Sequence, residues 1–126
     1  MSSVPGTLAE ALAAFQSSLP TIKKGDTAKV QTKTGGEYTY KFADLADVNG
    51  VVLPALAAVG LSFSSKPTLR DNRFVLAYRL LHTSGEVDEG EYPLPQSGTP
   101  QEYGSAITYA RRYVLCSMTG VAPAKD

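Results

Sequence analysis

The feature that most constrains the fold is an amphipathic stretch near the end of the 126-residue chain, between residues 101 and 117. With successive side chains turned by about 100°, the stretch divides into two faces. The apolar face consists of Tyr103, Ala106, Ile107, Ala110, Tyr113, Val114 and Ser117. The other face consists of Gln101, Ser105, Thr108 and Arg112, with Gly104 and Arg111 beside them. The stretch therefore predicts a helix with an apolar back and a small, polar, doubly cationic front.

This front differs from an ordinary solvated helix face, where Glu and Lys residues normally mix. It carries no carboxylate beyond its first turn. The small side chains of Gly104, Ser105 and Thr108 would let a ligand approach the backbone closely. Arg111 and Arg112 add positive charge beside them. We therefore interpret the front as a surface that receives an anion.

The length of the chain suits one domain with a hydrophobic core and is too short for two ordinary domains. Apolar residues make up 43% of it, which indicates a folded globule. The single cysteine, Cys116, excludes an internal disulfide framework and indicates a packed or semi-exposed thiol in a reducing compartment. No apolar run approaches the roughly 18 residues of a membrane helix, and no signal peptide is evident.

Twelve basic and twelve acidic residues give a formal net charge of zero, which argues against a histone-like basic coat. The charges are unevenly spread, however. Residues 22–42 carry five lysines against two acids, and residues 86–91 carry four acids. Such a dipolar surface suits head-to-tail self-association, or one face that meets a polyanion. Chance clustering on a small protein is the alternative.

The N-terminal part predicts a helix and then a hairpin. Thr7 and Glu10 have the spacing of a capping box, and Pro20 ends the first helix. Its apolar positions are Leu8, Ala11, Leu12, Phe15 and Leu19. Residues 28–32 and 37–42 flank a Gly-Gly turn and predict a β-hairpin. One side of this hairpin can pack through its aromatic residues while the other presents Lys29, Lys33 and Lys41, either to a ligand or simply as a solvated edge.

The middle of the chain predicts a second helix and three strands. Asp44 caps the helix, and Pro54 costs about 3 kcal/mol inside it, so we expect a kink or a restart near residues 49–51. Gly60 is suited to its C-terminal end. Strands at 61–69, 73–82 and 86–94 follow, joined by Asp71-Asn72 and Ser84-Gly85. The third strand is acidic, which fits an antiparallel sheet with one side in water or at a subunit boundary.

Several kinds of chemistry lack a signature. The chain contains neither a phosphate-binding P-loop nor a dinucleotide-binding glycine motif. His82 is the only histidine, so neither a Ser–His–acid triad nor a histidine-based metal site is expected. Glu86, Asp88, Glu89 and Glu91 would divide between two strand faces, and we interpret them as surface acids, with a metal site as the alternative. What remains is tyrosine with lysine and arginine, the combination that forms a sugar-phosphate track with stacking surfaces.

The chain resembles a known family. Gly104-Ser-Ala-Ile-Thr-Tyr-Ala-Arg-Arg-Tyr113, preceded by Pro100-Gln-Glu, resembles the signature helix of the Erf (essential recombination function) family of phage single-strand annealing proteins. Tyr40-Lys-Phe-Ala-Asp-Leu-Ala-Asp-Val48 with Leu53-Pro-Ala-Leu56 is similar to its second block. Leu80-Leu-His-Thr-Ser-Gly-Glu86 is similar to a third. The resemblance covers roughly residues 7–122 in the right order.

The resemblance implies an α+β fold like that of the Rad-group annealing ring, with a β-hairpin and a three-stranded antiparallel sheet packed against helices. It implies a single core domain over residues 1–126. The aspartate-rich segment that usually follows the signature helix in this family is not present, so we expect either a core fragment or a short member of the family. The implied activity is ATP-independent binding and annealing of single-stranded DNA in phage recombination, with no enzymatic step and no cofactor. The implied assembly is a ring or helical filament with a basic groove across subunits. Partners would be a phage exonuclease and the host single-strand-binding protein, in the bacterial cytoplasm.

The candidate site follows from the charged and aromatic residues. Lys41, Arg111 and Arg112 are expected to contact phosphates most directly. The remaining candidates are Lys23, Lys24, Lys29 and Lys33 as second-rank contacts, Ser105 and Thr108 on the helix front, and Tyr40 and Tyr109 as stacking or sugar contacts. Tyr103 and Tyr113 are assigned to packing. Tyr40 could equally belong to the core, and Arg111 could pair with an acid of a neighbouring subunit. For the whole chain, a self-assembling scaffolding protein and a metal-dependent nuclease are the alternatives.

Overall fold

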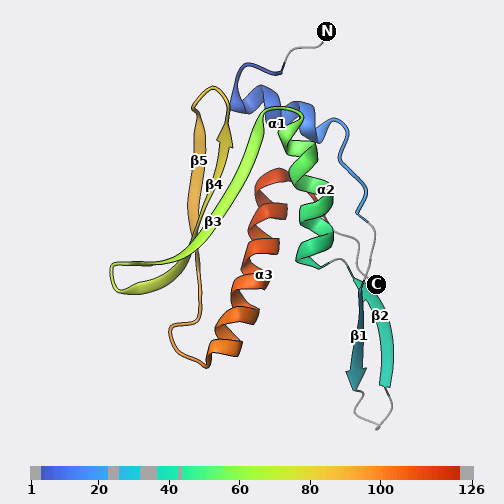
Figure 1. Cartoon of the computed structure of the whole chain (residues 1–126), viewed down its shortest axis with the longest axis vertical. Coiled ribbons are helices and arrows are strands. Elements are labelled where there is room, and N and C mark those ends of the chain that lie inside the picture. Colours follow the sequence, from blue (N-terminus) through green and yellow to red (C-terminus); the bar gives the residue numbers. More distant parts are fainter. Residues whose placement is uncertain (1–3, 23–25, 32–36, 43, 123–126) are drawn as a thin grey trace.

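The computed structural model describes residues 4–22, 26–31, 37–42 and 44–122. These residues form α-helices, a two-stranded hairpin and an open three-stranded antiparallel sheet, so the predicted α+β class is confirmed (Figure 1). The elements are α1 (Leu8–Gln16), β1 (Asp26–Gln31), β2 (Glu37–Phe42), α2 (Leu45–Ala57), β3 (Leu61–Arg70), β4 (Arg73–His82), β5 (Val87–Pro93) and α3 (Pro100–Thr119).

The sheet has the order β3-β4-β5, and each strand is antiparallel to its neighbour. Asp71 and Asn72, with φ angles of 51° and 63°, form the two-residue turn between β3 and β4. Two consecutive left-handed residues twist the ribbon in the sense that flanking strands prefer, and Asp and Asn tolerate that backbone better than most residues. The β3–β4 ribbon extends past the helices and curves away from them (Figure 1).

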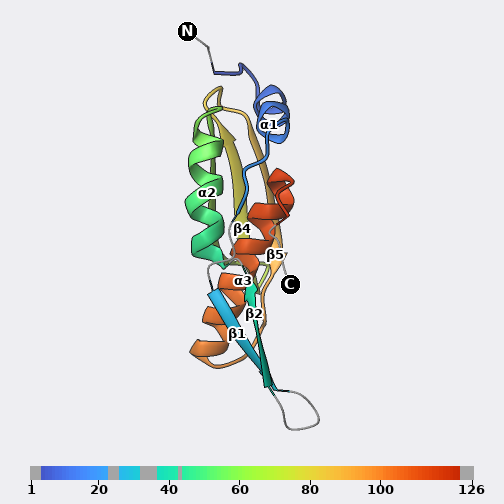
Figure 2. The same ribbon diagram turned by 90° about the vertical axis from the view of Figure 1, so that its right-hand side faces the viewer.

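Two helices cover one face of this sheet. In Figures 1 and 2, α2 and α3 run alongside each other against the sheet, and α1 lies across one end. Alternate residues of β4, such as Leu76 and Leu80, are fully buried beneath the helices. On the opposite face, which carries the odd-numbered residues of β4, Arg73 and Arg79 are exposed. One face of the sheet is therefore core and the other is open.

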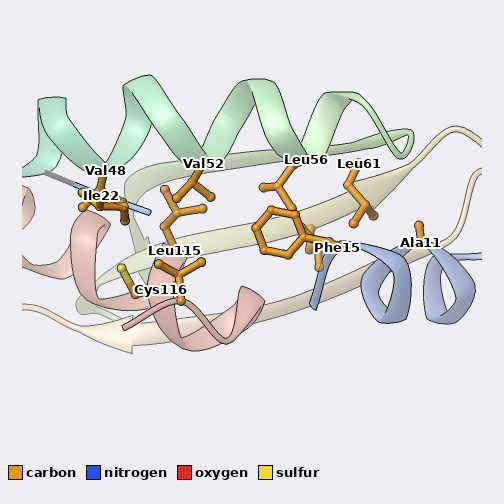
Figure 3. Packing of buried hydrophobic residues seen from close by; sticks show 11 residues of the cluster. Ala11, Phe15, Ile22, Val48, Val52, Leu56, Leu61, Leu115 and Cys116 are labelled. Atoms are coloured by element: carbon orange, nitrogen blue, oxygen red, sulfur yellow. The ribbon is translucent and has the colours of Figure 1, made fainter. Parts of the chain in front are cut away.

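The core consists of two neighbouring clusters of buried side chains. The larger one lies where α1, α2 and the C-terminal half of α3 meet the sheet, and it includes Phe15, Leu56 and Leu115 (Figure 3). The smaller one lies between the middle of α3 and β4, around Leu76. Phe63 of β3 packs against both clusters and so connects them.

Helix α1 begins as predicted and ends earlier. The Thr7 side chain accepts a hydrogen bond from the backbone N–H of Glu10 at 3.0 Å. The helix stops at Gln16, and Leu19, predicted as part of its apolar stripe, is 45% exposed. The Ser17 hydroxyl donates to the carbonyl of Ala14 at 2.7 Å, a local bond that competes with the helical ladder. The extension of this helix to Pro20 was therefore wrong.

Helix α2 is one helix from Leu45 to Ala57, so a restart near residues 49–51, one of the two predicted alternatives, was wrong. Its start is fixed by a reciprocal capping box between Asp44 and Asp47, with bonds of 2.8 and 3.1 Å. Val48, Val52 and Leu56 are completely buried along one stripe. Burying each aliphatic side chain contributes about 1.5–3 kcal/mol, so together they outweigh the roughly 3 kcal/mol cost of Pro54.

The hairpin β1–β2 precedes α2 and projects toward the end of the molecule where α3 begins (Figures 1 and 2). Its antiparallel register pairs Lys29 with Thr39 and Thr27 with Lys41. Lys41 therefore stands two residues along its strand from Thr39, the partner of Lys29, and Tyr40 is paired with Ala28. The predicted turn between the strands lies outside the described residues.

Candidate nucleic-acid interface

Helix α3 is held at both ends by its own sequence. Thr99 caps it by accepting from the N–H of Glu102 at 3.1 Å, and the Glu102 carboxylate accepts from the N–H of Thr99 at 2.9 Å. The hydrogen bond from the Thr99 N–H, followed by one from the Thr99 side chain, lowers the pKa of the Glu102 carboxyl below its usual value. Pro100 occupies the first turn, where its missing N–H costs nothing. Gly120, with φ of 84°, ends the helix in the left-handed conformation.

The predicted back of α3 packs against the sheet. Ala110 and Val114 are buried beside Leu76, and Ile107 packs against the same cluster. Tyr103 meets Phe74 edge-on, with ring centroids 5.4 Å apart, so its predicted packing role is confirmed. The helix is thus fixed in rotation, and its front must face away from the sheet.

The front is exposed only along the first part of the helix. Ser105, Thr108 and Arg111 are exposed there, and Arg112 is half-buried. Further along the same side, Leu115 and Cys116 belong to the larger core cluster. On this side of the helix, the surface available to a ligand therefore runs from the start of α3 to Arg111. The start of α3 lies at the same end of the molecule as the hairpin (Figure 1).

The two neighbouring arginines reach different sides of α3. Arg111 lines a cavity of about 210 Å³ between α2, β3 and α3, together with Asn49 and Ser65. None of the described carboxylates forms an ion pair with Arg111. The guanidinium carbon of Arg112 instead lies 5.9 Å from the centroid of the Tyr109 ring. A ligand that lies on the α2 side of α3 would therefore contact Arg111 rather than Arg112.

Tyr109 and Tyr113 form an exposed aromatic pair on the Arg112 side. They are 53% and 50% exposed. Their rings are nearly parallel at 15°, with centroids 6.1 Å apart. Tyr113 also contacts Tyr92 of β5, with centroids 5.4 Å apart. The assignment of Tyr113 to packing was therefore only half right, and Tyr92 was missed because strand alternation gives no sign of which helix residue it meets.

Three of the four acidic residues of 86–91, Glu86, Glu89 and Glu91, have partners within the chain. Glu89 pairs with Arg79 and Glu91 with Arg70, each at 3.1 Å, on the open face of the sheet. Glu86 accepts hydrogen bonds from the Leu8 N–H at 3.0 Å and the Ser84 hydroxyl at 2.9 Å. Within the described part of the chain, no group of three or more His, Cys, Asp or Glu side chains is arranged to hold a metal ion.

Comparison with known proteins identifies the family. The family model described as the ERF superfamily matches residues 8–126. The chain belongs to the ERF superfamily. No curated protein and no solved structure gives a match.

Membership confirms the resemblance drawn from the signature helix and implies a role in phage single-strand annealing and recombination, with binding of single-stranded DNA. Annealing proteins of this family are generally not enzymes. Among the described helices of this ERF protein, none is long and apolar enough to span a membrane.

The ERF protein brings together only some of its predicted site residues. Ser105, Thr108, Tyr109 and Arg111 are exposed on α3, and the half-buried Arg112 lies on the same helix but on the Tyr109 side. Lys29 lies on β1, and Tyr40 and Lys41 lie on β2. Lys23, Lys24 and Lys33 lie outside the described residues. The cavity beside Arg111 was not predicted, since no local pattern relates α2 to β3.

Proposed function

We propose that this ERF protein binds single-stranded DNA and anneals complementary strands without nucleotide hydrolysis. The supporting observation is the exposed, carboxylate-poor front of α3, with Arg111 at a cavity beside α2. The hairpin that carries Lys29 and Lys41 projects toward the same end of the molecule (Figure 1). A phosphate backbone running between these elements would meet cations from both.

Annealing needs little chemistry from the protein. DNA base stacking contributes about 1.4 kcal/mol per step, so pairing itself drives the reaction. The protein has to neutralise phosphates, extend the strand and leave the base edges accessible. This role requires neither a catalytic residue nor a cofactor, and in it Arg111 and Lys41 contact phosphates while Ser105 and Thr108 donate hydrogen bonds. Lys29 adds charge on the same hairpin, and Lys23, Lys24 and Lys33 are further candidates.

We further propose that the protein assembles into a ring or helical filament, in the annealing-ring fold, so that this basic groove continues from subunit to subunit. A chain of zero net charge can then bind a polyanion, because each copy contributes the same local patch. Its setting would be the host cytoplasm, with a phage exonuclease and the host single-strand-binding protein as partners.

The binding site is tested by titrating a labelled oligonucleotide across a range of salt concentrations. For single strands the logarithm of the binding constant falls with the logarithm of salt by about 0.7 per phosphate contact. Arg111→Ala should therefore weaken binding and reduce this slope by about 0.7. Arg73→Ala removes the same charge from the open face of the sheet and should leave both quantities unchanged. If Arg111→Ala and Arg73→Ala change affinity and salt slope equally, or if neither changes them, the proposed phosphate contact at Arg111 is rejected.

The annealing activity is tested with complementary fluorescent oligonucleotides in the absence of ATP and Mg²⁺. We expect the protein to accelerate pairing well beyond the spontaneous rate. A scaffolding protein would not shift the oligonucleotide in an electrophoretic assay, and a nuclease would shorten it once Mg²⁺ is added. Either result would contradict the proposal.

A further inference from the structure

A row of aromatic rings lies across α3 and β5, on the other side of α3 from Arg111. Tyr92, Tyr113 and Tyr109 follow one another in this row, with centroid distances of 5.4 and 6.1 Å. Arg112 lies over the Tyr109 ring at 5.9 Å and ends the row with a positive charge. We call these four residues the tyrosine row.

The row borders a cavity of about 310 Å³. Its lining residues are Tyr109, Arg112, Tyr113, Cys116, Ser117 and Val121. Burial raises the pKa of the Cys116 thiol, so that side chain is neutral at pH 7. Among the described residues that line this cavity, Arg112 carries a positive charge and none is a carboxylate. An anionic ligand with a flat apolar part would find both features complementary.

The row is ordered before any ligand arrives. Tyr113 is contacted from one side by Tyr92 and from the other by Tyr109, yet half of it stays exposed. Most large aromatic side chains bury their area in a core, and Tyr103 on the same helix does so against Phe74. Two parallel, half-exposed rings on one helix face are therefore a surface that a partner can cover at little cost in side-chain entropy.

We propose that the tyrosine row stacks nucleobases of single-stranded DNA, on a surface separate from the phosphate track at Arg111. The proposal rests on the proposed function, since it assigns a further contact to the same ligand. Aromatic rings stack on every base, so such a contact binds without sequence preference. Arg112 would hold the phosphate next to the stacked base. Each protomer then contacts the strand at two places, with α3 between them.

The test compares ring removal with ring retention in the full chain. A stacked base contact of ordinary strength changes affinity by at least about fivefold. Tyr109→Ala and Tyr113→Ala should each weaken oligothymidine binding by at least that factor, measured by anisotropy, with an unchanged salt slope. Tyr109→Phe and Tyr113→Phe should bind as the unchanged protein does. Leu69→Ala, which removes an apolar side chain 67% exposed at the β3–β4 turn, is the control.

The outcomes separate this proposal from the proposed function. If the unchanged protein binds no oligonucleotide, the proposed function itself fails. If the unchanged protein binds and Arg111→Ala weakens binding, but Tyr109→Ala and Tyr113→Ala leave the affinity unchanged, the stacking proposal is overturned. It is also overturned if the alanine variants alter assembly size in light scattering without DNA, because the row would then be a contact between copies. Tyr109→Ala guards against misfolding of Tyr113→Ala, since Tyr113 contacts Tyr92, a residue packed against the smaller core cluster.

Discussion

At the residue scale, Glu86 connects parts of the chain that are far apart in sequence. Its carboxylate accepts from the N–H of Leu8, in the first turn of α1, and from Ser84 in the β4–β5 turn. A carboxylate at a helix N-terminus also meets the positive end of the helix dipole. The hydrogen bond from Leu8 is the main reason that the pKa of Glu86 lies below its ordinary value of 4.5.

This bond predicts an acid-side loss of stability. A carboxyl whose pKa is lowered on folding stabilises the folded state above the unfolded pKa, and the contribution disappears as pH falls through the folded pKa. Glu86→Gln should therefore lower the midpoint of unfolding at pH 7. In this variant the midpoint should also fall less steeply as the pH drops below 4.5. Asp88→Asn removes a nearby exposed carboxylate and is the control. Equal acid-side curves for Glu86→Gln and the unchanged protein would show that the bond does not form.

At the element scale, the caps of α3 fix the helix that carries both proposed DNA contacts. Thr99→Ala removes the side chain that accepts from the N–H of Glu102, and losing such a cap costs about 1 kcal/mol. Urea unfolding should show this loss, whereas Thr99→Ser keeps the hydroxyl and should stay close to the unchanged protein. An unchanged midpoint for Thr99→Ala would mean that packing alone sets the start of α3.

The elements also show how far the sequence could be interpreted. Period-two and helical patterns predicted the strands, the starts of α1 and α2 and the back of α3, because side-chain spacing records which face is buried. The start of α3 was missed, since Pro100 had been assigned to the preceding loop and is instead the first residue of the helix. The early end of α1 has no clear signal in the sequence before Pro20, and the continuity of α2 depends on burial that only the whole fold reveals. The same limit applies to Arg111 and Arg112. Their spacing was known, but the neighbours that separate them, α2 on one side and Tyr109 on the other, come from the tertiary structure.

At the scale of the whole molecule, the two core clusters meet through shared elements. Helix α3 contributes Leu115 to the larger cluster and Val114 to the smaller one, and Phe63 packs against both. Strand β4 also belongs to both clusters, because Leu80 lies in the larger one and Leu76 in the smaller one. The physical expectation is that neither cluster can lose its packing without disturbing the other.

That connection predicts one cooperative unfolding transition, which is what a single domain requires. Leu56→Ala in the larger cluster and Leu76→Ala in the smaller one each remove a completely buried side chain, at a cost of about 2–5 kcal/mol. Each substitution should lower the unfolding midpoint equally whether unfolding is followed by far-ultraviolet circular dichroism or by tyrosine fluorescence. The two signals move together because helix content and the aromatic contacts of α3 depend on the same core. Leu69→Ala, on the exposed turn, should shift neither signal. Two separated transitions, with Leu76→Ala shifting only the one seen by fluorescence, would instead show that the cluster between α3 and β4 unfolds by itself. The surface that carries Arg111 and the tyrosine row could then open while the rest of the molecule stays folded.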